Sequence, residues 1–262
     1  MLTAAALLLC YAATIRGMAG QWWNDEDMGH GFAVPLVVAW IVYRERSQWL
    51  PRVESPSNWG WALLAAGAGM HFVSMVGAGL FAGSLALLTS LTGALVLAGG
   101  FALLKALRFP LLVSLCMLPK LAVVYNQVTL PMQLLASRMA ETILLTAGAA
   151  VRRSGNILEV SGHRISVAEA CNGVRYLLPL IFLALVFGYV ESSRTWLRLL
   201  LVTAAIPLAI VANALRVAGS AWRPALAEGT PHAILGLAIF VVCLGALAAL
   251  GKLPGGSLRH AD

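Results

Sequence analysis

Long apolar runs without a single charged side chain dominate the sequence. The longest covers residues 55–104, and others cover 28–43, 109–119, 121–137, 176–190, 199–215 and 229–251. A bilayer core cannot satisfy exposed backbone polar groups, so apolar segments that cross it must be helices of about 20 residues. The pattern therefore predicts eight membrane-spanning helices, at residues 2–15, 28–43, 58–77, 82–104, 109–125, 174–190, 199–215 and 232–251.

The composition agrees with this pattern and excludes several other classes of protein. Apolar residues make up 60% of the 262 residues and charged residues 11%, whereas soluble domains carry about 45–50% and 25%. A soluble enzyme, a disordered chain and a disulfide-stapled scaffold are therefore excluded. The excess of 18 Lys and Arg over 11 Asp and Glu does not indicate nucleic-acid binding, because the cations are scattered between apolar runs. We expect an all-α polytopic bundle that forms a single integral membrane domain over residues 1–262.

The distribution of Lys and Arg predicts the orientation of the chain in the membrane. With eight spans, one face receives the cations of residues 44–58, 105–108, 194–198 and 252–259. Short loops rich in Lys and Arg face the cytoplasm. Both termini are therefore expected in the cytoplasm, with the chain in the inner (cytoplasmic) membrane of the cell.

One connection on the outer side, residues 126–173, is too long for a passive loop. Residues 134–151 are expected to form a helix along the membrane surface, with Arg138 and Glu141 three residues apart on one face. Residues 156–167 alternate in type around a Ser-Gly pair, which is typical of a β-hairpin. An irregular loop is about equally compatible with this stretch. The segment is thus interpreted as an extracytoplasmic insert.

Cys171 differs from the other cysteines because it lies in a polar sequence directly before a span. Cys10, Cys116 and Cys243 lie within apolar runs, and no spacing among the four indicates zinc or a disulfide framework. The N-terminus of a helix favours a thiolate, and Arg175 lies one turn farther along. Cys171 is therefore a candidate nucleophile, with a structural cysteine at a helix entrance as the alternative.

Two further polar residues are expected at the same depth as Cys171. Arg216 ends the seventh span, three residues after Asn213, and His232 begins the eighth. Ionisable residues at a membrane boundary are functional candidates, although a snorkelling arginine and an interfacial histidine are the simpler alternatives. A thiolate that attacks a carbonyl, a histidine that moves protons and an arginine that stabilises the oxyanion suffice for acyl transfer.

Taken together, these motifs resemble the exosortase/archaeosortase family of polytopic membrane cysteine transpeptidases. The resemblance rests on the segments GHGFAVPL, PMQLLAS, RRSGNILEV and VAEACNGVRYL, and on the later NALR and PH. It implies that Cys171 is the nucleophile and that Arg216 and His232 complete the catalytic set. Nearby residues would support this set or bind substrate: Glu169, Asn172, Arg175, Asn213 and His30.

The resemblance also implies the substrates. Such enzymes recognise a C-terminal sorting signal that consists of a short motif (Pro-Glu-Pro in the bacterial members), a transmembrane helix and a basic tail. They cleave on the extracytoplasmic side and transfer the protein to an acceptor. The expected partners are therefore the sorting-signal segments of exported proteins, membrane lipids and an acceptor nucleophile, with no nucleic acid and no cofactor.

Three questions remain open from the sequence. Asp25, Glu26 and Asp27 precede the second span, but adjacent carboxylates cannot readily surround one ion; contact with a cationic substrate segment is preferred and no metal is expected. Hydropathy places Lys120 one turn inside the fifth span. The resemblance instead places it at the membrane surface, because Leu118-Pro119-Lys120 stands where the family usually has Pro-x-Pro at the outer end of this span. A small-molecule transporter or a non-catalytic assembly factor would also have many spans, although no internal repeat of the transporter type is present.

Overall fold

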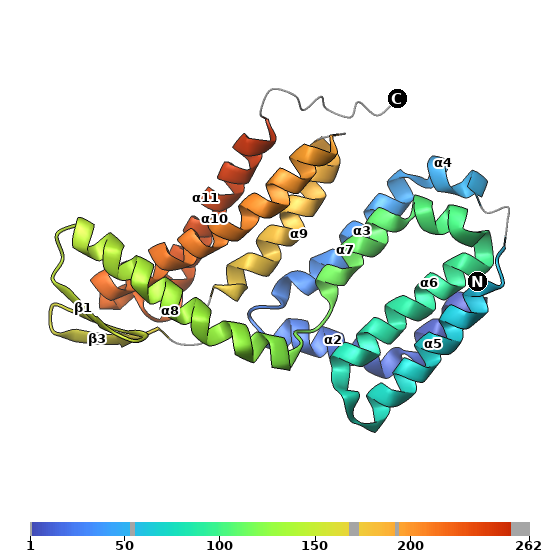
Figure 1. Ribbon diagram of the computed structural model, residues 1–262, viewed down its shortest axis with the longest axis horizontal. Helices are drawn as coiled ribbons and strands as arrows, with labels where there is room; N and C mark the ends of the chain where they lie inside the picture. Colours follow the sequence, from blue (N-terminus) through green and yellow to red (C-terminus); the bar gives the residue numbers. More distant parts are fainter. Residues whose placement is uncertain (1, 53–55, 168–172, 192–193, 253–262) are drawn as a thin grey trace. The chain divides into compact units, whose positions relative to one another are not determined.

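Helices make up most of the protein, and they fall into two compact units. The computed structural model describes residues 2–52, 56–167, 173–191 and 194–252 (Figure 1). The units are Met1–Leu121 and Ala122–Asp262, and each is described by itself. Among the described residues, strands occur only between Val151 and Ser166. The expected helical membrane bundle is therefore correct in kind, with a small sheet added, and the single domain over residues 1–262 stays a prediction.

The first unit consists of helices and the turns between them. In chain order its elements are α1 (Leu2–Cys10), α2 (Ala12–Asn24), η1 (Gly29–Phe32), α3 (Ala33–Arg44), α4 (Arg46–Trp49), η2 (Leu50–Arg52), α5 (Trp59–Val73), the π-helical turn η3 (Ser74–Ala78), α6 (Gly79–Ala106), α7 (Arg108–Ser114) and η4 (Leu115–Met117).

Within this unit, α5 and α6 form a close antiparallel pair (Figure 1). A Cβ atom on Gly60 would lie 2.6 Å from the carbonyl oxygen of Gly93, which shows how closely the two backbones approach. Small residues permit such contact between membrane helices. The chain reverses at Gly77 and Gly79, whose φ angles of 144° and 77° suit glycine but few other residues. The two predicted spans 58–77 and 82–104 therefore correspond to this pair.

Two of the predicted spans in the first unit are interrupted. The segment 2–15 is divided at Tyr11, where α1 ends and α2 begins. The segment 109–125 is not one helix, because η4 ends at Met117 and Leu118 is extended, with ψ at 138°. Pro119 explains this second break, since proline disfavours helical geometry in the residue before it and supplies no backbone donor.

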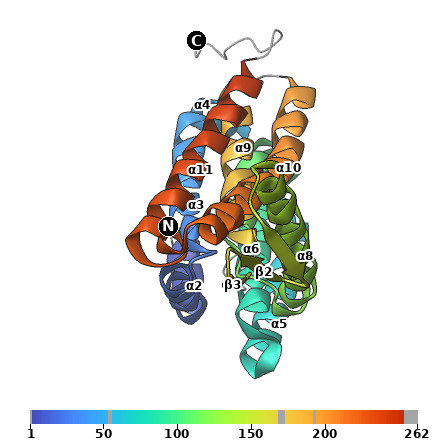
Figure 2. The same cartoon turned by 90° about the vertical axis from the view of Figure 1, so that its left-hand side faces the viewer.

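The described residues of the second unit form helices and a three-stranded sheet. Its elements are α8 (Ala122–Thr146), β1 (Val151–Ser154), β2 (Ile157–Val160), β3 (His163–Ser166), α9 (Val174–Glu191), α10 (Thr195–Trp222), η6 (Pro224–Leu226) and α11 (Gly229–Gly251). The long helix α10 packs against α8, α9 and α11 (Figure 2). The helix α10, which carries Arg216, therefore holds α8, α9 and α11 together.

The predicted hairpin at residues 156–167 is confirmed. β2 and β3 pair antiparallel, and Val160 faces His163 across a two-residue turn. Ser161 and Gly162 have φ angles of 51° and 83°, as a type I′ turn requires. The sequence did not reveal β1, which pairs antiparallel with β2. The expected helix over 134–151 is correspondingly too long, because α8 ends at Thr146.

The sheet is fastened to α8 and to the C-terminal half of α10. A buried apolar cluster joins residues of α8, β2 and α10, including Ala140, Leu158 and Val217. The Ser137 hydroxyl of α8 donates a hydrogen bond of 3.1 Å to the Gly155 carbonyl, in the turn between β1 and β2. The sheet therefore stabilises the part of α10 that carries Arg216.

Four helical segments of the described chain are long and apolar enough to cross a membrane. They are Trp59–Ala106, which contains the α5–α6 pair, Val174–Glu191, Thr195–Trp222 and Gly229–Gly251, and a fifth results if the helices on either side of residues 118–121 form one broken span. The predicted spans 174–190, 199–215 and 232–251 lie within α9, α10 and α11; α10 is longer than predicted, so Arg216 lies inside this helix and not at its end. The predicted span 28–43 corresponds to a shorter apolar helix, Gly29–Arg44, so the count of eight is not reached.

Candidate active site

Arg216 and His232 meet at the contact between α10 and α11. The Nη2 atom of Arg216 donates a hydrogen bond to Nε2 of His232 over 2.5 Å. The other ring nitrogen, Nδ1, donates to the Leu226 carbonyl over 2.8 Å. The turn through η6 brings this carbonyl and the first turn of α11 back toward α10. Two of the residues expected to share one depth therefore lie in direct contact.

Arg216 belongs to a row of polar residues on one face of α10. Asn213 precedes it by three residues and Ser220 follows it by four, so all three project on the same side of the helix. Their exposed fractions are 1% for Asn213, 2% for Arg216 and 7% for Ser220. The Ser220 hydroxyl donates to the Leu226 carbonyl over 3.1 Å and lies 3.4 Å from Nδ1 of His232. A buried polar strip thus runs along this half of α10.

Tyr176 of α9 and Gly236 of α11 complete the surroundings of the guanidinium. The central carbon of the Arg216 guanidinium lies 5.5 Å from the centre of the Tyr176 ring, a cation–π distance. A Cβ atom on Gly236 would lie 2.8 Å from the Tyr176 hydroxyl and 3.5 Å from Nε of Arg216. The glycine therefore makes room for both side chains, and a larger residue would displace them.

The guanidinium retains hydrogen-bonding capacity in this buried position. The Nε and Nη1 atoms of Arg216 have no acceptor among the described residues. Arginine carries only donors, in a fixed planar arrangement suited to anionic oxygens. Buried donors of this kind are costly unless an acceptor reaches them. The arrangement can therefore bind a carbonyl oxygen, a carboxylate or a developing oxyanion.

The predicted nucleophile, Cys171, precedes α9 in the sequence. Cys171, Glu169 and Asn172 lie outside the described residues, so their predicted roles stay predictions. The chain is described again from Gly173, whose φ is 86°. A Cβ atom there would lie 3.4 Å from the side chain of Asn213 and 3.3 Å from that of Met132. Gly173 therefore packs directly against the polar row of α10.

The remaining supporting residues are divided between the units. Arg175 is half-buried in the first turn of α9. His30 belongs to the first unit, where it lies in η1 and its Nε2 donates to the Cys116 carbonyl over 3.1 Å. The predicted contributions of both residues to the site stay predictions.

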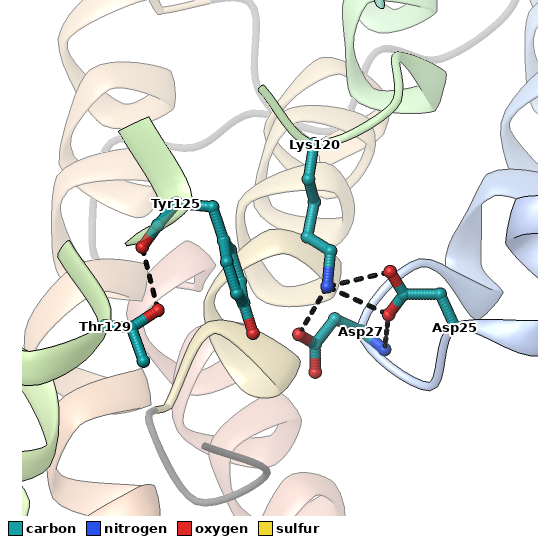
Figure 3. Close-up of polar contacts among 5 residues, drawn as sticks. All are labelled: Asp25, Asp27, Lys120, Tyr125 and Thr129. Carbon is teal, nitrogen blue, oxygen red and sulfur yellow. Dashed lines mark hydrogen bonds and ion pairs between the residues drawn. The ribbon is translucent and has the colours of Figure 1, made fainter. Parts of the chain in front are cut away.

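A second polar cluster occupies the first unit (Figure 3). The Lys120 ammonium lies 2.8 Å from a carboxylate oxygen of Asp25 and 2.9 Å from one of Asp27. The three side chains are 16%, 24% and 10% exposed. In the structure, Lys120 of the same chain is the cation that contacts the two aspartates. Contact with a cationic segment of the substrate, which the sequence favours, stays a prediction. Lys120 lies on the non-helical residues after η4, so it is not part of a continuous fifth span.

Metal chemistry finds no support in the described part of the chain. No group of three or more His, Cys, Asp or Glu side chains there is placed to hold a metal ion. The ammonium between Asp25 and Asp27 fills the place that a cation would need.

Sequence reasoning missed three residues around Arg216. Ser220 could have been found, because its spacing of four from Arg216 places both on one face of the predicted seventh span. Tyr176 lies in the segment VAEACNGVRYL, but nothing in that segment indicates that its ring lies against an arginine of another span. Gly236 gave no signal, since a glycine in an apolar helix is common and its role depends on a tyrosine of another span.

The sequence matches a known protein family. The family model described as transmembrane exosortase (Exosortase_EpsH) matches residues 22–249. No curated protein and no solved structure matches the chain. The matched range includes α9, α10 and all but the last two residues of α11, and so includes every residue of the Arg216 cluster.

Proposed function

Because the chain belongs to the transmembrane exosortase family, we propose that it is a membrane-embedded cysteine transpeptidase with Cys171 as its nucleophile. The observation that carries the proposal is the hydrogen bond between buried Arg216 and half-buried His232, in which the guanidinium has further donors without an acceptor among the described residues. Arg216 would stabilise the oxyanion, as preorganised donors do in acyl transfer. A purely structural arginine would have its donors matched by acceptors.

Chain connectivity supports Cys171 as the nucleophile of this group. Cys171 precedes Gly173 by two residues, and two peptide units span at most about 7 Å between Cα atoms. Gly173 contacts Asn213, which lies one helical turn from Arg216. Of the other cysteines, Cys243 is buried in the apolar core of α9, α10 and α11. We therefore infer that Cys171 is the reactive thiol, because it precedes by two residues a glycine that contacts the polar row of α10.

The reaction follows from these groups. The Cys171 thiolate attacks the carbonyl carbon of the scissile peptide, and the carbonyl oxygen becomes an oxyanion held by the donors of Arg216. The C–N bond then breaks, a thioester forms, and the departing amine takes up the equivalent of the proton that the thiol released. An acceptor nucleophile then attacks the thioester carbonyl, and the Cys171 thiolate leaves. The acceptor loses its own proton to the medium.

The substrates proposed are exported proteins that end in a sorting signal with a Pro-Glu-Pro-like motif, a transmembrane helix and a basic tail. This proposal rests on the family. We also propose that the chain lies in the inner membrane, with both termini in the cytoplasm and the site on the outer side. The loops rich in Lys and Arg support this orientation.

Processing of such a tail tests the proposed function. The full chain and a tagged protein with a tripartite tail are produced together in membranes, and cleavage is followed by gel shift. We expect Cys171→Ala to abolish processing at an unchanged enzyme level. Cys10→Ala is the matched control, since Cys10 is an exposed cysteine of the first unit, and it should process normally. Full processing by Cys171→Ala would refute the proposal, and a substrate adduct on Cys171 detected by mass spectrometry would support it.

A further inference from the structure

Both ring nitrogens of His232 are already engaged, and their partners define the state of the ring. A guanidinium has donors and no acceptor, so Nε2 must accept the hydrogen bond from Arg216 and carries no proton. The Leu226 carbonyl has only acceptor capacity, so Nδ1 carries the proton and donates it. The hydrogen bonds therefore require a neutral imidazole in a single tautomer.

The surroundings of the ring agree with this neutral state. His232 lies in the first turn of α11, which begins at Gly229. The charged group in described contact with the ring is Arg216, itself a cation. The Ser220 hydroxyl is neutral. It donates a hydrogen bond to the Leu226 carbonyl, which also accepts the hydrogen bond from Nδ1 of His232. Protonation of Nε2 would set an N–H group against the guanidinium.

We propose that His232 is a positioning residue that holds the guanidinium of Arg216 in place, and that Ser220 assists by fixing the Leu226 carbonyl. This inference rests on the proposed function and changes one part of it, because the sequence suggested that His232 moves protons. The lone pair that a general base would use is occupied by Arg216. Protons released and taken up at Cys171 would then travel through water of the outer face.

The arrangement has a clear physical purpose. An arginine side chain has many rotamers, and fixing it in one of them costs conformational entropy. Stabilisation of an oxyanion requires donors that are already oriented before the charge develops. His232 holds one end of the guanidinium at Nη2, and the Tyr176 ring lies beside its face. The Nε and Nη1 donors then remain aimed at the place where the reacting carbonyl would bind.

A glutamine at position 232 separates positioning from proton transfer. The amide oxygen of glutamine can accept the hydrogen bond from Arg216, but an amide does not exchange protons near neutral pH. We expect His232→Gln in the full chain to keep kcat/KM for tail cleavage within about tenfold of the unsubstituted enzyme. Its pH profile should keep the same limbs. His232→Leu, which cannot accept a hydrogen bond, should lose at least a hundredfold, and Ser220→Ala should lose a few-fold with an unchanged profile.

Other outcomes would overturn the inference. If folded His232→Gln is as inactive as His232→Leu, or if one limb of its pH profile disappears, His232 transfers protons. Thermal melting in detergent identifies a variant that has failed to fold, and the pH profile of His232→Gln remains decisive if only His232→Leu is unstable. Failure of the proposed function gives a different result, because Cys171→Ala would then process the tail whatever residue occupies position 232.

Discussion

Replacing Gly67 by alanine should destabilise the first unit, although alanine is the better helix former. Gly67 lies in α5 where that helix meets α6, and a Cβ atom there would lie 2.1 Å from the Ser90 hydroxyl oxygen. It would also lie 3.0 Å from the Ser90 backbone nitrogen and 3.1 Å from the Ala86 carbonyl oxygen. The added methyl group must therefore turn the Ser90 side chain and separate the two helices slightly.

The expected magnitude combines three contributions. In a helix, alanine is about 1 kcal/mol more favourable than glycine. Against this, overpacking costs about 1–3 kcal/mol. Displacement of the Ser90 hydroxyl also breaks its buried hydrogen bond of 2.7 Å to the Tyr11 hydroxyl, which costs about 1–3 kcal/mol. The net expectation is a loss of about 3 kcal/mol in the free energy of unfolding.

Gly69→Ala provides the matched control, because Gly69 lies in the same helix and a Cβ atom there would have no atom within 4 Å. Thermal unfolding of both purified variants in detergent can be followed by tryptophan fluorescence. We expect the Gly67→Ala midpoint to fall by several degrees, while the Gly69→Ala midpoint stays level or rises. Equal midpoints would show that α5 and α6 are not packed at Gly67 as described.

Two further substitutions test the other polar contacts. Lys120→Met leaves two largely buried carboxylates without their cation. It should lower the free energy of unfolding by at least about 2 kcal/mol, since breaking a buried ion pair costs more than breaking an exposed one. Lys105 is exposed, so Lys105→Met should have an unchanged melting temperature. In Gly236→Ala the added methyl group displaces the Tyr176 hydroxyl next to Arg216, which should lower kcat/KM for tail cleavage about tenfold. Gly245 lies on the same helix with no atom within 4 Å of an added Cβ, so Gly245→Ala should cleave normally.

Much of the second unit was predictable because its signals are local. Each of α9, α10 and α11 coincides with a charge-free apolar run, and a run of this kind specifies a membrane helix without reference to the rest of the chain. The β2–β3 hairpin likewise follows from alternation around Ser161 and Gly162. For Arg216 and His232 the sequence predicted a shared depth in consecutive spans, whereas their hydrogen bond is a finding of the structure.

Features that depend on distant partners were not predictable in the same way. The strand β1 is only four residues long, and two of them are arginines at what looks like a helix end. It exists through pairing with β2. The ion pairs of Lys120 join residues more than 90 positions apart, and hydropathy placed Lys120 inside a helix that Pro119 in fact interrupts. Local patterns contain no information about such pairings.

The energetics of Arg216 argue that its surroundings serve chemistry more than stability. A buried donor without an acceptor costs about 1–3 kcal/mol, and Arg216 has two such nitrogen atoms among the described contacts. A well-packed apolar side chain at the same position would often be as stable or more so. Gly236 also weakens α11 relative to alanine, yet its lack of a side chain is what admits Tyr176 and Arg216. Both costs are offset once an anionic oxygen of a substrate reaches the free donors. In the proposed reaction, binding of that oxygen is the step that would use these donors.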